Sequence, residues 1–282
     1  DPRLTLLHCP DQGIVPALNM GLEHARSELI ARFDADDRMA PLRLARQAQA
    51  MHAHPDWSLC TTQVISEGLD GGPAGPGMTR LVERLNSLKR PEAIRAARFI
   101  DIPVVHPAVM FRRDEVMKAG GYHNGHFGED HDLWLRLLEA GCTFGMVDEV
   151  LVTWRDHAAR MTRSDPKLTS EGALRALVAR HLAEGPLSDR ACRIWGGGRC
   201  GRRYARALHD AGAHVSDIID IDPAKIGRRV AHGVSIVNAE EVGPPDERLV
   251  LVAVATPGAR GLIAQRLSAL GYHVERDWLP LR

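Results

Sequence analysis

The fold is decided by residues 29–37, LIARFDADD, in which an apolar run of strand length passes directly into an acidic cluster. Residues 29–33 have the composition of a buried strand, and Asp34, Asp36 and Asp37 follow where that strand ends. Open α/β sheets bind their ligands at the carboxyl ends of their strands. Two carboxylates separated by one residue in an extended segment point the same way, so this stretch indicates a ligand site.

Strand-like and helix-like segments alternate on both sides of this stretch. Before it, residues 4–8 form an apolar run of strand length, and residues 18–25 have the apolar spacing of a helix. After it, Pro41 begins another helical pattern, and residues 57–64 have the composition of a strand. The alternation predicts an α/β fold. Because residues 4–8 look like a strand that enters a β-α unit, we also expect sequence upstream of the first residue.

A second acidic cluster stands before a predicted helix further along the chain. After a glycine- and proline-rich loop at 68–77, two helices and a strand are expected within residues 80–111. Residues 128–132, GEDHD, then lead into an amphipathic helix over 133–140. Acidic side chains at a helix start also favour the positive end of the helix dipole. A capping role for this cluster is therefore an alternative to a catalytic one.

The two acidic clusters and their flanking residues resemble the motifs of the family 2 glycosyltransferases. Residues 19–37 contain a D-x-D signature like that of the family, and residues 106–136 look like its acceptor-side segment and E-D motif. The resemblance implies a GT-A-like mixed-sheet nucleotide-sugar domain over residues 1–163, without its first strands. It also implies an inverting, metal-dependent glycosyltransferase that moves a sugar from a nucleoside-diphosphate sugar to a hydroxyl acceptor, in surface polysaccharide or glycolipid synthesis.

The resemblance gives a role to each acidic residue. It implies that Asp36 binds Mg²⁺ or Mn²⁺, that Asp34 lies toward the ribose or the metal, and that Asp37 belongs to the donor site. Asp130 matches the family's general base, and Glu129 is placed beside it in an acceptor-site role. An isolated D-x-D-D string is equally typical of a solvated acidic turn that caps the next helix. The metal role therefore depends on the resemblance.

Three further residues are assigned to the same site. His157 follows the E-D helix, where the family carries an arginine or histidine segment, and its imidazole can reach the metal or the diphosphate. His106, held extended by the proline after it, is expected to line the acceptor or to be structural. Trp134 is a second acceptor-lining candidate, although the apolar spacing around it favours the core.

A glycine-rich turn marks a second domain, expected over residues 190–282 after a helical linker at 164–189. Between a predicted strand and a predicted helix, the pattern G-x-G-x-x-G permits a tight turn and the close approach of a pyrophosphate. The next strand ends at an acid where a ribose-binding carboxylate belongs. These features predict a small Rossmann-like parallel α/β domain that binds NAD(P) or another nucleotide, with a structural or dimerising module as the alternative. The residues concerned are Gly196, Gly198, Gly201, Asp220 and Asp222.

Composition excludes some partners and leaves two other functions open. The 36 basic and 36 acidic residues balance, which argues against a nucleic-acid partner. The five scattered cysteines suit a reducing compartment, and no apolar run is long enough to span a bilayer. We expect a cytoplasmic protein, with peripheral association at the inner membrane face and a homodimer left open. An NAD(P)-dependent oxidoreductase and a non-catalytic binding or scaffold protein are the alternative functions.

Overall fold

The computed structural model describes residues 1–11, 13–124, 128–157, 174, 178, 187, 189–256 and 258–281. The chain divides into two compact units. The first comprises Asp1–Arg98 and Ile102–Leu168, and the second comprises Phe99–Asp101 and Thr169–Arg282. The helix expected within the linker at 164–189 lies almost entirely outside the described residues.

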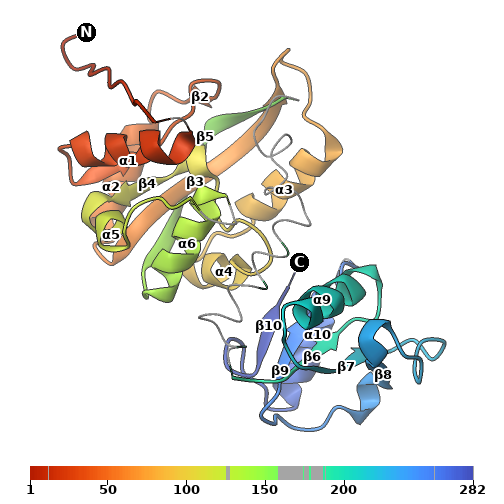
Figure 1. Ribbon diagram of the computed structural model, residues 1–282. Helices are drawn as coiled ribbons and strands as arrows, with labels where there is room; N and C mark the ends of the chain where they lie inside the picture. Colours follow the sequence, from red (N-terminus) through yellow and green to blue (C-terminus); the bar gives the residue numbers. More distant parts are fainter. Residues whose placement is uncertain are drawn as a thin grey trace. The chain divides into compact units, whose positions relative to one another are not determined.

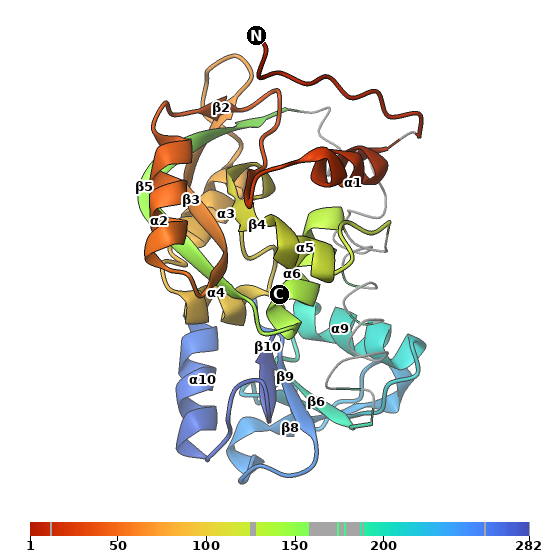
Figure 2. The ribbon, with the colours of Figure 1, turned by 90° about the vertical axis from the view of Figure 1, so that its left-hand side faces the viewer.

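In the part of the chain that the structure describes, the first unit is built on a five-stranded mixed sheet, which confirms the predicted α/β fold with a mixed sheet (Figure 1). The two long strands β3 and β5 run parallel and side by side, with α2 against them (Figure 2). The pairs β1–β4, β3–β4 and β2–β5 are antiparallel, and the strand order is β1-β4-β3-β5-β2. The strands are β1 Leu29–Ala31, β2 Arg38–Met39, β3 Trp57–Gly68, β4 Met110–Arg112 and β5 Thr143–Asp156.

Helices surround this sheet and bury its apolar core. One cluster of buried side chains joins α1 and α6 to β3, β4 and β5 around Trp134. The helix α6 begins at Glu129, four residues before the predicted start, because Gly128 precedes three acidic residues that suit a first helical turn. The helices are α1 Ile14–His24, α2 Arg43–Ala53, α3 Pro76–Asn86, α4 Pro91–Ala97, η1 His106–Ala108, α5 Arg113–Lys118 and α6 Glu129–Glu139.

A buried polar pair on α2 holds the end of β1 in place. The guanidinium of Arg43 is fully buried and donates to the carbonyl oxygens of Arg32 at 2.8 Å and Val109 at 3.1 Å. Its Nε donates to Gln47, whose amide donates to the Ala108 carbonyl at 3.0 Å. Burial lowers the pKa of Arg43 to about 10. Because buried polar groups are costly unless bonded, these contacts fix the backbone where β1 passes into the acidic cluster.

The strand predicted at residues 4–8 does not form. Residues 4–9 have no regular secondary structure, and the side chains of Leu4 and Leu6 are 79% and 93% exposed. No strand among the described residues pairs with this segment. An extended segment without a paired neighbour leaves its backbone groups to water, so apolar composition alone does not make it a strand.

Among its described residues, the second unit contains a five-stranded sheet whose strand pairings are all parallel, as predicted. Its strand order, β10-β9-β6-β7-β8, is that of a doubly wound sheet, with β6 and β9 at the point where the winding reverses (Figure 1). The elements are β6 Cys192–Trp195, α9 Arg199–Asp210, β7 Val215–Asp220, η3 Ala231–Gly233, β8 Ser235–Asn238, η4 Ala239–Glu241, β9 Leu249–Val252, α10 Ala259–Ala269 and β10 Trp278–Pro280.

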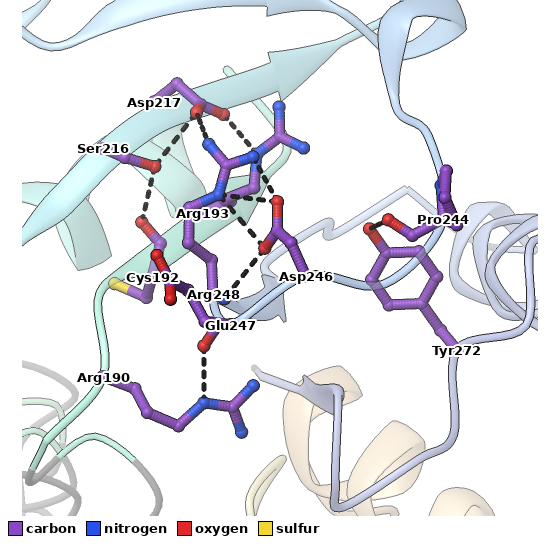
Figure 3. A network of polar contacts seen from close by, with 10 residues as sticks. All are labelled: Arg190, Cys192, Arg193, Ser216, Asp217, Pro244, Asp246, Glu247, Arg248 and Tyr272. Atoms are coloured by element: carbon purple, nitrogen blue, oxygen red, sulfur yellow. Dashed lines mark hydrogen bonds and ion pairs between the residues drawn. The ribbon is translucent and has the colours of Figure 1, made fainter.

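A polar network ties together the amino-terminal ends of β6 and β7 (Figure 3). Arg193 Nε donates to Asp217 Oδ1 at 2.8 Å, and both residues are about nine-tenths buried. Arg248 donates to the other carboxylate oxygen of Asp217 at 3.2 Å, and the Ser216 hydroxyl donates to it at 3.0 Å. A buried carboxylate with three donors is well satisfied. The network braces the end of the sheet opposite the glycine-rich turn.

Candidate active site

The three aspartates after β1 bring their carboxylates together. One oxygen from each of Asp34, Asp36 and Asp37 lies within 4.8 Å of the others. Asp37 is buried and accepts the Arg155 backbone N–H at 2.8 Å, and its own N–H donates to the Asp34 carbonyl at 3.2 Å. Hard oxygen donors at this spacing are the ligands that Mg²⁺ and Mn²⁺ prefer. The residues present therefore fit a divalent cation.

The end of β5 closes this cluster from the other side. His157 Nε2 lies 2.9 Å from Asp36 Oδ2, and the Arg155 guanidinium donates to the Asp36 carbonyl at 3.2 Å. Asp36 and His157 are 121 positions apart in the chain, and the pairing of β2 with β5 brings their segments together. The structure thus places together the two residues that were predicted to hold a metal. Their metal role itself stays a prediction.

Glu129 and Asp130 lie in the first turn of α6, and burial is the largest cause of the rise in the pKa of each. Burial, followed by the neighbouring Asp130 charge, raises the pKa of Glu129 to about 7. Burial also raises the pKa of Asp130, whose Oδ1 accepts the His131 backbone N–H at 2.7 Å. That bond satisfies a helix-terminal donor, so the predicted capping role and a catalytic role use the same residue. A carboxyl group with a pKa near neutrality can exchange a proton at physiological pH.

Arg32 is a site residue that sequence reasoning missed. Its side chain is 9% exposed and forms an ion pair with Asp34. Its charge also acts on Glu129 and on Asp130, where it opposes the rise in pKa caused by burial. A smaller part of the rise at Glu129 comes from Asp34. The charges of the two acidic motifs therefore act on one another, and the guanidinium of Arg32 acts on both. The signal in the sequence was a charged arginine within the apolar run that precedes the acidic cluster.

His106 begins the 3-10 helix η1, so the expectation that Pro107 holds it extended is wrong, and its ring contacts both Glu129 and Trp134. His106 Nδ1 is 3.8 Å from Glu129 Oε1, and its Nε2 is 3.0 Å from the Tyr122 hydroxyl. Burial holds the pKa of His106 well below its ordinary value. The Trp134 ring meets the His106 ring edge-on, with centroids 5.7 Å apart, and is completely buried. Trp134 thus occupies the core position that its apolar neighbours indicated.

Comparison with known proteins covers this same unit. Residues 1–121 match the family described as glycosyl transferase family 2. This segment belongs to that family. The family 2 segment contains the Asp34, Asp36 and Asp37 cluster and Arg32, and it ends before Glu129.

Three glycosyltransferases are similar to about half of this chain. A UDP-Gal:alpha-D-GlcNAc-diphosphoundecaprenol beta-1,3-galactosyltransferase of Escherichia coli is 32% identical over 145 residues, 51% of this chain and 50% of its own. The amylovoran biosynthesis glycosyltransferase AmsE of Erwinia amylovora is 33% identical over 51% and 50%. The O-antigen biosynthesis glycosyltransferase WbnJ of Escherichia coli is 30% identical over 50% and 52%. The chain thus spans about half the length of these relatives. Among the described helices, none has the length and apolar character needed to cross a membrane.

The glycine-rich turn lies outside the family 2 segment, and its geometry requires two of its glycines. Gly196 has φ +123°, and a Cβ there would lie 2.8 Å from the Ala253 carbonyl oxygen. A Cβ on Gly201 would lie 1.8 Å from the Gly196 carbonyl oxygen, so this glycine lets α9 pack against the turn. A Cβ on Gly198 meets nothing within 4 Å among the described residues. The turn is thus tight on one side and open at Gly198.

The acid predicted to bind a ribose is engaged by the turn itself. Asp220 Oδ2 accepts the Gly197 N–H at 2.7 Å, and Oδ1 accepts the Asp222 N–H at 2.9 Å. Lys225 Nζ lies 3.3 Å from a carboxylate oxygen of each acid. Burial opposes ionisation of Asp220, but these donors outweigh it and lower its pKa. Asp222, with a side chain 42% exposed, is the acid of the two that faces solvent.

Proposed function

We propose that the first unit transfers a sugar from a nucleoside-diphosphate sugar to a hydroxyl acceptor, with inversion at the anomeric carbon. The observation that supports this most strongly is the position of Arg32, which pairs with Asp34 and acts on Glu129 and Asp130. A glycosyl transfer needs a group that holds the donor and a group that activates the acceptor at one reaction centre. The match of residues 1–121 to glycosyl transferase family 2 supports the same reaction.

On the donor side, four side chains would hold Mg²⁺ or Mn²⁺. They are Asp34, Asp36, Asp37 and His157, which supply carboxylate oxygens and one imidazole nitrogen. The cation, when bound, neutralises charge that develops on the diphosphate as it leaves. Arg32 keeps Asp34 paired, and the Arg155 N–H orients the Asp37 carboxylate. These fixed contacts hold the donor-side carboxylates in place before the donor arrives.

On the acceptor side, Asp130 is the proposed general base. It takes the proton of the acceptor hydroxyl while that oxygen forms a bond to the anomeric carbon, and the bond from this carbon to the diphosphate oxygen breaks. Attack from the face opposite the leaving group inverts the anomeric centre. Glu129, protonated below about pH 7, limits the negative charge beside Asp130. His106 contacts Glu129 and forms the acceptor-side wall.

The names of the relatives suggest the first substrates to test. The Escherichia coli galactosyltransferase is named for UDP-Gal and for a sugar carried on diphosphoundecaprenol. We therefore propose a UDP-hexose donor and a lipid-linked sugar acceptor, in the synthesis of a surface polysaccharide at the cytoplasmic face of the membrane. The purified full chain is to be incubated with UDP-sugars and lipid-linked acceptors, with Mn²⁺ or with EDTA. We expect an inverted product with Mn²⁺ alone, and no transfer from any donor would overturn the proposal.

The second unit offers a separate candidate site. The glycine-rich turn lies where the winding of the parallel sheet reverses, the usual ligand position in such sheets, and it is open at Gly198. We propose that it binds NAD(P) or another nucleotide, with a structural or dimerising role as the alternative. Gly198→Val fits its extended backbone and fills the opening. Thermal melting of the full chain with NAD(H), NADP(H) or UDP-sugars should show a shift that Gly198→Val removes.

A further inference from the structure

Two histidines and an aspartate gather on the second unit, at the far end of α9 from the glycine-rich turn. His209 and Asp210 are the last two residues of α9, and His232 lies in η3, between β7 and β8. One ligand atom of each lies within 4.8 Å of the others. Because α9 has 12 residues and rises about 1.5 Å per residue, roughly 18 Å separates this cluster from the turn. The cluster is therefore separate from the glycine-rich turn of the same unit.

The distance between two of the ligand atoms suits a cation with tetrahedral coordination. His232 Nε2 lies 3.3 Å from Asp210 Oδ1. Zinc bonds of about 2.0–2.1 Å give ligands about 3.3–3.4 Å apart in a tetrahedron, so this pair already has the spacing of one edge. The imidazole rings of His209 and His232 are stacked, with centroids 3.7 Å apart and planes 13° apart. They must turn before both nitrogens face one ion, and exposed side chains rotate readily.

The backbone at His232 presents its imidazole to α9. His232 has φ +63°, in the left-handed region that residues with a Cβ seldom adopt. The turn that imposes it is closed by hydrogen bonds from the Val230 N–H to the Val234 carbonyl at 2.9 Å and from the Gly233 N–H to the Val230 carbonyl at 3.0 Å. In this conformation the His232 ring lies on His209 rather than away from it.

We propose that His209, Asp210 and His232 bind Zn²⁺, with water completing the tetrahedron. Two imidazoles and one carboxylate suit Zn²⁺, Co²⁺ or Ni²⁺, whereas Mg²⁺ and Ca²⁺ prefer oxygen ligands throughout. The ion links the end of α9 to the segment that leads into β8. Zn²⁺ thereby stabilises the second unit, because it binds the folded arrangement, and in the unfolded chain His232 is apart from the other two ligands.

The test uses the full chain carrying Asp36→Ala and His157→Ala, which removes two of the four candidate metal ligands of the first unit, among them the imidazole that Zn²⁺ would favour. Calorimetry with Zn²⁺ should show one equivalent bound, and Co²⁺ should give the visible absorption of a tetrahedral site. His232→Asn tolerates the left-handed backbone and removes the imidazole. It should weaken Zn²⁺ binding by at least the ~10–100-fold that loss of a supporting metal contact costs, and His209→Ala should do the same.

The matched control is His214→Ala, which changes another exposed histidine of the same unit outside the cluster. It should leave the Zn²⁺ affinity and the Zn²⁺-induced rise in melting temperature unchanged. Millimolar Mg²⁺ should not displace Zn²⁺. Absence of a Zn²⁺ equivalent in the doubly substituted chain, or equal affinity in His232→Asn, overturns the site and leaves an ordinary surface ion pair between His232 and Asp210.

Discussion

The same acidic pattern, Asp-x-Asp after a strand, occurs once in each unit and has opposite surroundings. In the second unit, Asp220 accepts two backbone N–H groups and faces Lys225, and its pKa is lowered in spite of burial. In the first unit, Asp34 and Asp36 gather with another carboxylate, and burial and a neighbouring acid raise the pKa of nearby Glu129 to about 7. Asp220 stands alone between two backbone donors and Lys225, whereas Asp34, Asp36 and Asp37 face one another and have Arg32 and His157 as partners of the first two. We therefore propose that the surroundings, not the pattern, distinguish a structural clamp from a metal site.

The largest expected effect tests whether only the first pattern binds a metal. Asp36→Ala should lower both metal-dependent donor binding and transfer by ~10³-fold, because a cation's help with the diphosphate amounts to several kcal/mol and each 1.36 kcal/mol is tenfold. Asp222→Ala, the matching change in the second pattern, should leave both unchanged. Calorimetry with nucleotide sugars, with and without EDTA, and single-turnover rates measure this. Undiminished donor binding in EDTA would contradict the metal role.

A second substitution separates chemistry from binding within the first unit. Asp130→Asn nearly keeps the shape and removes the proton acceptor, so transfer should fall by ~10²-fold while donor affinity stays almost constant. Glu129→Gln should have the smaller effect on transfer. Single-turnover rates and donor dissociation constants for both variants decide the assignment. If Asp130→Asn keeps the original rate, the base must be sought at Glu129 first, because Asp132 is already paired with Arg136 at 2.8 Å on the same helix.

The sequence could predict where each acidic pattern stands but not what surrounds it. The apolar run before Asp34 and the strand before Asp220 were both recognisable from composition, and so were the two sheets. Local patterns do not reveal that the charge of Arg32 acts on Glu129, almost a hundred positions later in the chain, because that interaction depends on the tertiary fold. The engagement of Asp220 by the Gly197 N–H is likewise a tertiary contact.

The third prediction tests the clamp in the second unit. Asp220→Asn removes the charge that holds the Gly197 N–H and Lys225, so unfolding of this unit should cost about 2 kcal/mol less, as expected when a buried charged hydrogen bond is lost. Lys225→Ala removes only the partly exposed partner and should cost under about 1 kcal/mol. Denaturant unfolding gives both values. Hydrogen exchange at residues 192–201 should become faster in Asp220→Asn alone, and equal exchange in both variants would show that Asp220 does not hold the turn.

The smallest expected effect concerns Glu129 in the first unit, whose raised pKa makes the free energy of unfolding depend on pH. Glu129 has an ordinary pKa of 4.5 and a folded pKa of about 7. Below about pH 4.5 it is protonated in both states, and its titration costs nothing. As the pH rises from 4.5 to 7, the unfolded chain releases this proton while the folded protein keeps it, so the folded state loses stability, and above pH 7 the loss is constant.

Glu129→Gln removes this penalty because glutamine does not titrate. The variant should therefore be more stable than the original chain by about 1–2 kcal/mol at pH 8 and should lose that advantage at pH 4.5. Denaturant unfolding at the two pH values measures the difference. Glu23→Gln, on the exposed side of α1, is the matched control and should show no such change between the two pH values. A Glu129→Gln variant that is less stable at pH 8 would mean that Glu129 is held ionised by a cation, as Asp220 is, and the contrast between the two units would disappear.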